Sequence, residues 1–215
     1  MRYVLLYIAV LIQLNLCAQL NYAPISIAKD KIKLHADSTR IHFKTKLYTN
    51  ALLGALEHYP ELKRLRIKVV SKKMNMLMRV RPSIISSFRK PAKRKYKIFI
   101  NSTNTNGIPI PDDFTFNAQV GVFAHELSHI CDYLNMSLGK LFYTARHYKK
   151  PAFKKEMERK TDLMTLEHGM GWQLYDYAVQ WSKLGEKFSK YIKTKNEFYL
   201  NSSEMMGLMM DLGYN

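Results

Sequence analysis

The sequence predicts an α+β fold, in which a small mixed sheet packs against helices. Three short segments in the first half alternate apolar with polar residues or are rich in β-branched and aromatic residues, as strands are. In the second half, apolar residues recur at three- and four-residue steps, which is the helical period. Because the strands and the long helices occupy separate parts of the chain, the α+β class is favoured.

Residues 1–18 have the pattern of a signal peptide. Arg2 precedes an almost unbroken apolar run over residues 4–16, which is too short for a membrane span of about 20 residues. The small residues around Cys17 suit cleavage after residue 18. We therefore expect a secreted or periplasmic protein with no stable membrane span after cleavage. Two alternatives stay open, namely a lipoprotein anchored through Cys17 and an uncleaved N-terminal anchor.

The first half of the remaining chain combines one expected helix with three expected strands. Residues 19–41 are polar and expected to be irregular, and residues 42–215 are expected to form one domain. A helix over residues 43–59 is indicated by a stripe of leucines that ends before Pro60. An exposed loop is expected over residues 89–95. Strands are expected over residues 65–69, 76–80 and 96–100.

The second half is expected to be mainly helical. Apolar residues have helical spacing over residues 112–134, 151–181 and 203–212. Asp112 or Asp113 can cap the first of these helices, and Pro151 suits the first turn of the second. A loop over residues 135–150 is expected to join these two helices.

The chain is strongly basic, with 34 Lys and Arg against 17 Asp and Glu and a formal net charge of +17. Basic clusters occur at residues 63–66, 89–95, 149–150 and 154–155. Such clusters bind anionic partners. The expected export argues against nucleic acid, which leaves anionic envelope polymers or acidic substrates; a solvated basic surface is the plainer alternative. Two cysteines are too few for a Cys-only zinc site or a disulfide framework.

The candidate chemistry is concentrated at His125-Glu126-Leu127-Ser128-His129, an H-E-x-x-H motif within an expected helix. Four residues turn a helix through about 400°, so His125 and His129 lie on one face and one turn apart. Two imidazoles so placed can bind one zinc ion, Zn2+. Glu126 lies about 60° from His129 around the helix axis. It can therefore act as general base toward a zinc-activated water without binding the metal.

A catalytic zinc ion needs a third protein ligand, and the sequence offers several candidates. Asp132 lies on the face of the motif but one turn further along, where a supporting role or a salt bridge is favoured. His147 lies in the expected loop. Glu158 is favoured, because it follows His129 by 29 residues, with room for a loop and a returning helix. Asp162, one turn after Glu158, can accept the N–H of a ligating histidine and fix its tautomer.

Together the two motifs resemble the gluzincin metallopeptidases, in which H-E-x-x-H is followed by E-x-x-x-D. The resemblance covers residues 96–181. Within the gluzincins it is to minimal single-domain forms and to the soluble core of the CAAX-prenyl-protease and heat-shock-protease family. It implies a zincin-like fold, with a small mixed sheet packed on an active-site helix and on a second, glutamate-bearing helix. It also implies that residues 96–100 form an edge strand that aligns an extended peptide.

The resemblance assigns roles to the residues that match. It implies zinc ligands at His125, His129 and Glu158, a catalytic base at Glu126, and a ligand-orienting partner at Asp162. The chain departs from the family at Thr161, where the residue before the aspartate is commonly Ala.

A hydrogen-bond donor that stabilises the developing oxyanion is also expected. His168 is the first candidate for this catalytic role, because it lies ten residues after Glu158 in the same expected helix. Three tyrosines are alternatives, Tyr175, Tyr177 and Tyr199. Cys131 lies about 200° round the helix from His129 and should face away from the metal.

The leading hypothesis is a secreted or periplasmic zinc metallopeptidase that hydrolyses a peptide or protein substrate. The second hypothesis is an extracytoplasmic binding protein in which zinc is structural or vestigial and the basic surface binds anionic envelope polymers. The third is a zinc enzyme that acts on a non-peptide amide such as a cell-wall crosslink. Substitution of Glu126 separates the first two hypotheses, because a binding module does not need a general base.

Overall fold

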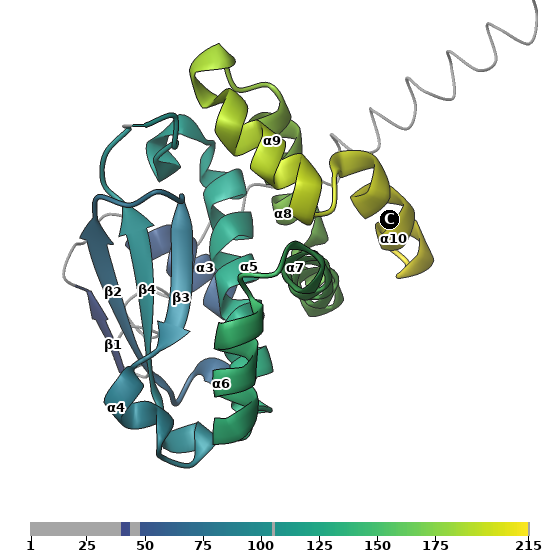
Figure 1. Cartoon of the computed structure of the whole chain (residues 1–215). Helices are drawn as coiled ribbons and strands as arrows, with labels where there is room; N and C mark the ends of the chain where they lie inside the picture. Colours follow the sequence, from purple (N-terminus) through teal and green to yellow (C-terminus); the bar gives the residue numbers. More distant parts are fainter. Residues whose placement is uncertain (1–39, 44–47, 105, 215) are drawn as a thin grey trace, which may run out of the picture.

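The computed structural model describes residues 40–43, 48–104 and 106–214 and has an α+β architecture (Figure 1). The sheet order is β1-β2-β4-β3, with β3 antiparallel to β4 and the other neighbours parallel. The α+β class and the small mixed sheet are therefore confirmed. The expected signal peptide and most of the expected irregular segment lie outside the described residues. The strands are β1 (Arg40–Phe43), β2 (Arg66–Lys72), β3 (Met78–Pro82) and β4 (Lys95–Asn101).

The strand expected at the edge of the sheet is internal. β4 contains the expected residues 96–100 and pairs along its whole length with β2, while β3 pairs with its other side. Consecutive residues of β4, Ile98 to Ile100, are buried, as in a strand that is covered on both faces. On the face away from the helices, Lys72 and Arg81 lie over the ring of Phe99. The edge position next to β4 belongs to β3.

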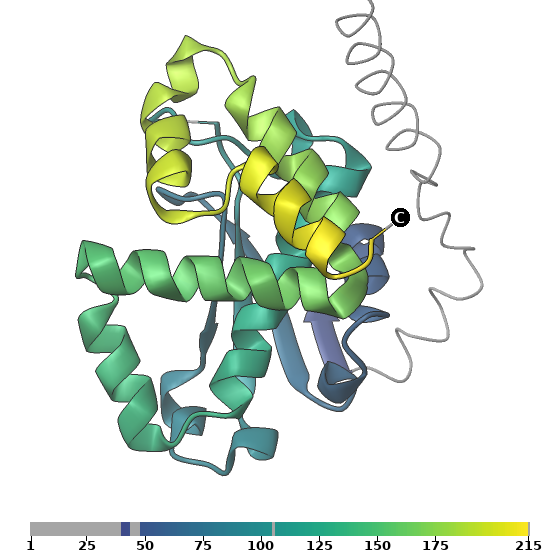
Figure 2. The same ribbon diagram turned by 90° about the vertical axis from the view of Figure 1, so that its right-hand side faces the viewer.

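Helices α3 and α5 lie against one face of the sheet, and α7 to α10 form the outer part of the molecule (Figure 2). Among the described residues, no helix combines the length and the apolar character of a membrane span. The helices are α3 (Thr49–Leu56), α4 (Ile84–Ser87), α5 (Phe116–Leu134), α6 (Leu138–His147), α7 (Pro151–Thr165), α8 (Gly171–Ser182), α9 (Ser189–Phe198) and α10 (Ser202–Asp211).

Helix α5, which carries the H-E-x-x-H motif, is the centre of the fold. It contacts α3 and the sheet on one side and α7 and α8 on the other, and every residue from 120 to 132 is buried. Its N-cap is Thr115, whose side chain accepts the N–H of Ala118. The expected caps, Asp112 and Asp113, lie instead in a preceding 3-10 turn. The motif therefore lies inside the packing of its neighbours, with little of each side chain exposed.

Two expectations about the helices after α5 are wrong. The expected loop over residues 135–150 contains α6, which Ser137 caps by accepting the N–H of Lys140. The expected long helix over residues 151–181 is broken between α7 and α8 by a π-helical turn, in which Gly169 has φ 77°. Only glycine adopts this conformation without strain, so Gly169 marks the break.

The packing of α5 on α8 depends on Gly121. A Cβ atom at this position would lie 2.3 Å from the backbone oxygen of Gln173 in α8. We predict that Gly121→Ala lowers the free energy of unfolding by about 1–3 kcal/mol, because the two backbones must separate. Gly207→Ala is the control, since nothing lies near its Cβ position and its helical propensity rises. Equal unfolding free energies of the two variants in urea would contradict this account of the packing.

Candidate metal centre

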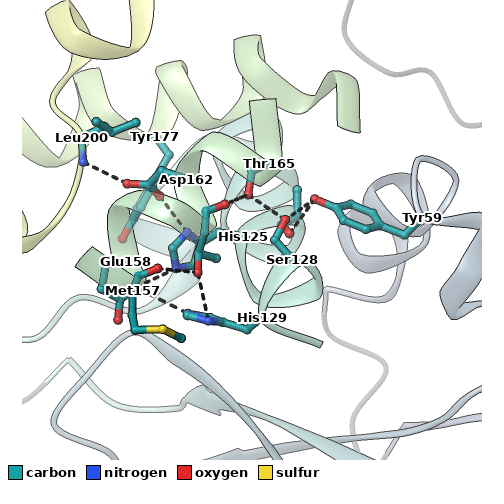
Figure 3. A network of polar contacts seen from close by, with 12 residues as sticks. Tyr59, His125, Ser128, His129, Met157, Glu158, Asp162, Thr165, Tyr177 and Leu200 are labelled. Atoms are coloured by element: carbon teal, nitrogen blue, oxygen red, sulfur yellow. Dashed lines mark hydrogen bonds and ion pairs between the residues drawn. The ribbon is translucent and has the colours of Figure 1, made fainter. Parts of the chain in front are cut away.

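Three buried side chains from two crossing helices converge in the interior (Figure 3). His125 and His129 come from α5, and Glu158 comes from α7. Glu158 Oε2 lies 3.1 Å from His125 Nε2 and 3.4 Å from His129 Nε2. One donor atom from each of the three residues lies within 4.8 Å of the other two. The structure thus brings together the three residues that the sequence nominates as zinc ligands.

The spacing of these atoms suits a tetrahedral metal ion. Zinc binds histidine nitrogen and carboxylate oxygen at about 2.0–2.2 Å, so two ligand atoms in a tetrahedral site are separated by roughly 3.3–3.5 Å. The two distances from Glu158 Oε2 to the imidazoles, 3.1 Å and 3.4 Å, are close to this value. The side chains therefore need little rearrangement to hold an ion between them.

Asp162 fixes the tautomer of His125. Its Oδ1 lies 2.8 Å from His125 Nδ1, and because a carboxylate only accepts, Nδ1 donates its proton. The Nε2 lone pair of a neutral His125 is therefore directed toward Glu158. Asp162 is itself held by the backbone N–H of Leu200, 2.9 Å from Oδ2. This arrangement of carboxylate and ligating histidine is common in zinc sites.

Thr161 fixes the tautomer of His129. Its hydroxyl donates to the backbone oxygen of Met157 at 2.8 Å, so its contact of 3.2 Å with His129 Nδ1 requires that nitrogen to donate. His129 then presents the lone pair of Nε2 toward Glu158. Thr161 therefore provides a hydrogen-bond acceptor that an alanine at this position would lack.

Tyr148 is a site residue that the sequence analysis missed. It follows α6, and its hydroxyl donates to Glu158 Oε1, the carboxylate oxygen that neither imidazole contacts. The segment was expected to be a loop without a defined position. The turn between α6 and α7 brings this hydroxyl to the ligand.

The three converging residues favour a positive charge between them. Burial alone would lower the pKa of His125, but hydrogen bonds to Asp162 and Glu158 outweigh it and raise this pKa to about 10. Burial opposes ionisation of Glu158 as well, yet hydrogen bonds from His125 and His129 hold its pKa well below the usual value. A proton on His125 or a metal ion supplies the charge that balances the buried carboxylate.

Glu126 lies beside this cluster with one carboxylate oxygen unpaired. Its Oε2 atom is buried and has no hydrogen bond to the described part of the chain. Burial raises the pKa of Glu126, and the nearest charges that act on it include His129, His125 and Glu158. Leaving a buried carboxylate oxygen unpaired is costly. This cost is expected at a site where the carboxylate acts on a bound molecule.

The structure places His168 in another polar cluster, which corrects its expected role near the metal. His168 Nε2 lies 2.9 Å from Glu61 Oε1, and its ring stacks on Tyr59. Cys131 donates to the same Glu61 oxygen and thus faces away from the metal ligands, as expected. The difference for His168 arises because the π-helical turn breaks the regular helix on which its position was projected from Glu158.

The other candidate residues are also held elsewhere or only border the centre. Asp132 forms a salt bridge with Lys160 at 2.6 Å, and His147 Nδ1 donates to the backbone oxygen of Tyr143. Tyr177 is hydrogen-bonded to Tyr191. The ring of Tyr175 packs on Trp172. The ring centroid of Tyr199 lies 5.5 Å from that of His125, so Tyr199 borders the centre.

Lys195 adds a cation near Tyr199. Its Nζ lies 3.6 Å from the Tyr199 ring centroid and also lies over the rings of Tyr177, Trp181 and Tyr191. Burial lowers the pKa of Lys195 to about 8, although the carboxylates of the centre oppose this shift. The centre is therefore bordered by an aromatic wall that holds one ammonium group.

Comparison of the chain with models of protein families, with curated proteins and with solved structures found no match. The class of the site is accordingly defined by its residues. It is a buried candidate metal centre with two nitrogen ligands and one oxygen ligand, whose histidines are oriented by Asp162 and Thr161.

The role of Thr161 predicts a specific loss of metal affinity. Thr161→Val keeps the shape of the side chain but leaves His129 Nδ1–H without its acceptor. We expect zinc to bind at least about 10-fold more weakly, as for other lost partners of ligating histidines. Thr161→Ser restores the hydroxyl and should bind zinc like the wild type. Competition with a chromophoric chelator measures both constants, and an unchanged constant for Thr161→Val would refute the assignment.

Proposed function

We propose that this protein is a zinc metallopeptidase of the gluzincin type, with a zincin-like domain over residues 42–215. One observation carries the proposal: the buried donor set of His125, His129 and Glu158 lies beside the buried carboxylate of Glu126, whose Oε2 atom has no hydrogen bond to the described residues. We also propose that the protein is secreted or periplasmic, on the evidence of the sequence of residues 1–18.

The donor set supports zinc in a catalytic rather than a structural site. Imidazole and carboxylate ligands suit zinc. Structural zinc sites usually have four protein ligands, whereas catalytic sites have three and leave a position open. Among the described residues, His125, His129 and Glu158 form a set of three. An open coordination position favours hydrolysis over the binding-protein hypothesis, in which Glu126 has no catalytic role.

When bound, zinc would act as a Lewis acid toward water and the substrate carbonyl. In this mechanism Glu126 accepts a proton from the attacking water and later delivers it to the nitrogen of the leaving amine. Its burial supports the first step, because a raised pKa makes the carboxylate a better base. Asp162, Thr161 and Tyr148 keep the ligands oriented while the proton moves.

The position of the sheet suggests how a peptide is aligned. β3 is the edge strand beside β4 and contacts α5. An edge strand presents unpaired backbone N–H and C=O groups, to which an extended peptide can add as a further strand. We propose β3, in place of the expected residues 96–100, as the strand that binds substrate backbone.

The proposal predicts that Glu126→Gln abolishes hydrolysis and spares the metal. The amide cannot accept the proton, so cleavage of an unstructured peptide library should slow by at least about 100-fold, while zinc content stays at the wild-type level. Mass spectrometry of the products measures the cleavage.

The matched control is Glu167→Gln, because Glu167 is an exposed carboxylate in the turn after α7. It should cleave like the wild type. Undiminished cleavage by Glu126→Gln would eliminate the assigned base. A zinc-loaded wild type that cleaves no peptide would favour the binding-protein hypothesis or an amide substrate of another kind.

A further inference from the structure

Large apolar side chains are exposed on two short helices at one end of the molecule. They are Ile84 and Ile85 on α4, Phe88 directly after it, and Phe142 and Tyr143 on α6. Ile85 is 84% exposed and Phe88 is 66% exposed. These five account for most of the large apolar side chains that are exposed in the described residues. We call the five residues the apolar tip.

The two parts of the apolar tip meet at Phe88 and Phe142. The rings of Phe88 and Phe142 lie 6.3 Å apart, and α4 and α6 lie at the same end of the molecule in both views (Figure 1, Figure 2). Exposed apolar side chains that gather in this way mark interaction sites, whereas scattered ones are ordinary. The tip is far in the fold from α9 and α10, which lie at other positions in both views.

Buried polar contacts hold the tip in shape. Ser86 in α4 donates to the backbone oxygen of Ser83 and accepts the N–H of Lys95. The buried guanidinium of Arg94 donates to the backbone oxygens of Tyr133 and Met136 at 3.0 Å and 2.8 Å. These bonds join the segment after α4 to the end of α5 and the approach to α6. The outward direction of Ile85 and Phe88 is therefore built into the fold.

The surroundings of the tip are basic without an acidic residue nearby in sequence. The chain has no Asp or Glu between Glu61 and Asp112, which includes α4, or between Asp132 and Glu156, which includes α6. Exposed cations flank the tip on the segment after α4 and on α6: Arg89, Lys90, Lys93, Lys95, Lys140 and Arg146. The partner of this surface should therefore be both anionic and apolar.

We propose that the apolar tip docks on the surface of an anionic phospholipid bilayer. The five apolar side chains insert at the level of the headgroups, and the flanking Lys and Arg side chains reach the lipid phosphates. A soluble anionic polymer would use the charges but would leave the apolar side chains in water. A second copy of this chain would bring two basic surfaces together, which their charge opposes.

Docking at the tip would also place at the bilayer the helix α6, which leads directly to a residue of the metal centre. α6 ends at His147, and the hydroxyl of the next residue, Tyr148, donates to the ligand Glu158. Polypeptide segments at the membrane surface are then the favoured substrate class, a point that rests on the proposed function. The docking itself needs no metal, so its test and the test of hydrolysis can fail separately.

Hydrogen–deuterium exchange of the full chain with lipid vesicles tests the docking at the tip itself. We expect vesicles of phosphatidylglycerol and phosphatidylcholine to slow exchange in residues 84–88 and 138–147, with little effect on α10. Vesicles of phosphatidylcholine alone should protect these residues much less. Absence of protection at the tip with anionic vesicles would overturn the proposal, even if another part of the chain binds lipid.

Two pairs of variants separate insertion from charge. The double variant Ile85→Ser with Phe88→Ser should lose the protection at residues 138–147, and its partition coefficient onto anionic vesicles should fall about 10-fold. Met210→Ser, which changes an exposed methionine of α10, should keep both the protection and the partition coefficient of the wild type. Lys90→Glu with Lys93→Glu should weaken docking more than Lys190→Glu on α9.

Two results would contradict the proposal in different ways. Protection that survives loss of Ile85 and Phe88 but disappears in Lys90→Glu with Lys93→Glu would mean attraction by charge alone, as for a polymer. Protection of the tip without vesicles that increases with protein concentration would mean self-association. Unchanged circular dichroism of the variants checks that they are folded.

Discussion

The contact of α5 with α7 is the constraint on which the rest of the structure depends. It places the carboxylate of Glu158 within 3.4 Å of two imidazoles in a region from which water is largely excluded. Such a group is stable only if a positive charge balances the carboxylate and every orienting hydrogen bond is made. The neighbouring residues satisfy this demand, since Asp162, Thr161 and Tyr148 each contact one ligand. The centre is thus a small network in which no ligand is positioned by its own helix alone.

Elements outside α5 and α7 also help to position the ligands. Leu200, between α9 and α10, donates its backbone N–H to Asp162, which in turn orients His125. Gly121 allows α8 to approach α5 closely, and the break at Gly169 turns the chain between α7 and α8. The sheet supports α5 from the other side and keeps β3 free at its edge. Elements far apart in sequence therefore share the task of holding three ligand atoms together.

The parts of this account that local spacing determines could be predicted from the sequence. His125 and His129 are one helical turn apart, and Glu158 and Asp162 likewise, so each pair shares a face wherever its helix lies. Spacing did not determine the rest: the internal place of β4 follows from its parallel partner β2, and Tyr148 reaches Glu158 through the turn that joins α6 to α7. The position of His168 could not be predicted, because a π-helical turn that begins at Leu166 interrupts the regular helix between Glu158 and His168.

Metal content tests the central claim most directly. The purified wild-type protein, Glu158→Gln and Glu156→Gln should be loaded with zinc, dialysed and analysed by mass spectrometry of the metal. Glu156 is an exposed carboxylate two residues before the ligand and is the matched control. The account predicts one zinc ion per chain in the wild type and in Glu156→Gln, and little or none in Glu158→Gln. A wild type that retains no zinc, or a Glu158→Gln variant that retains a full equivalent, would contradict it.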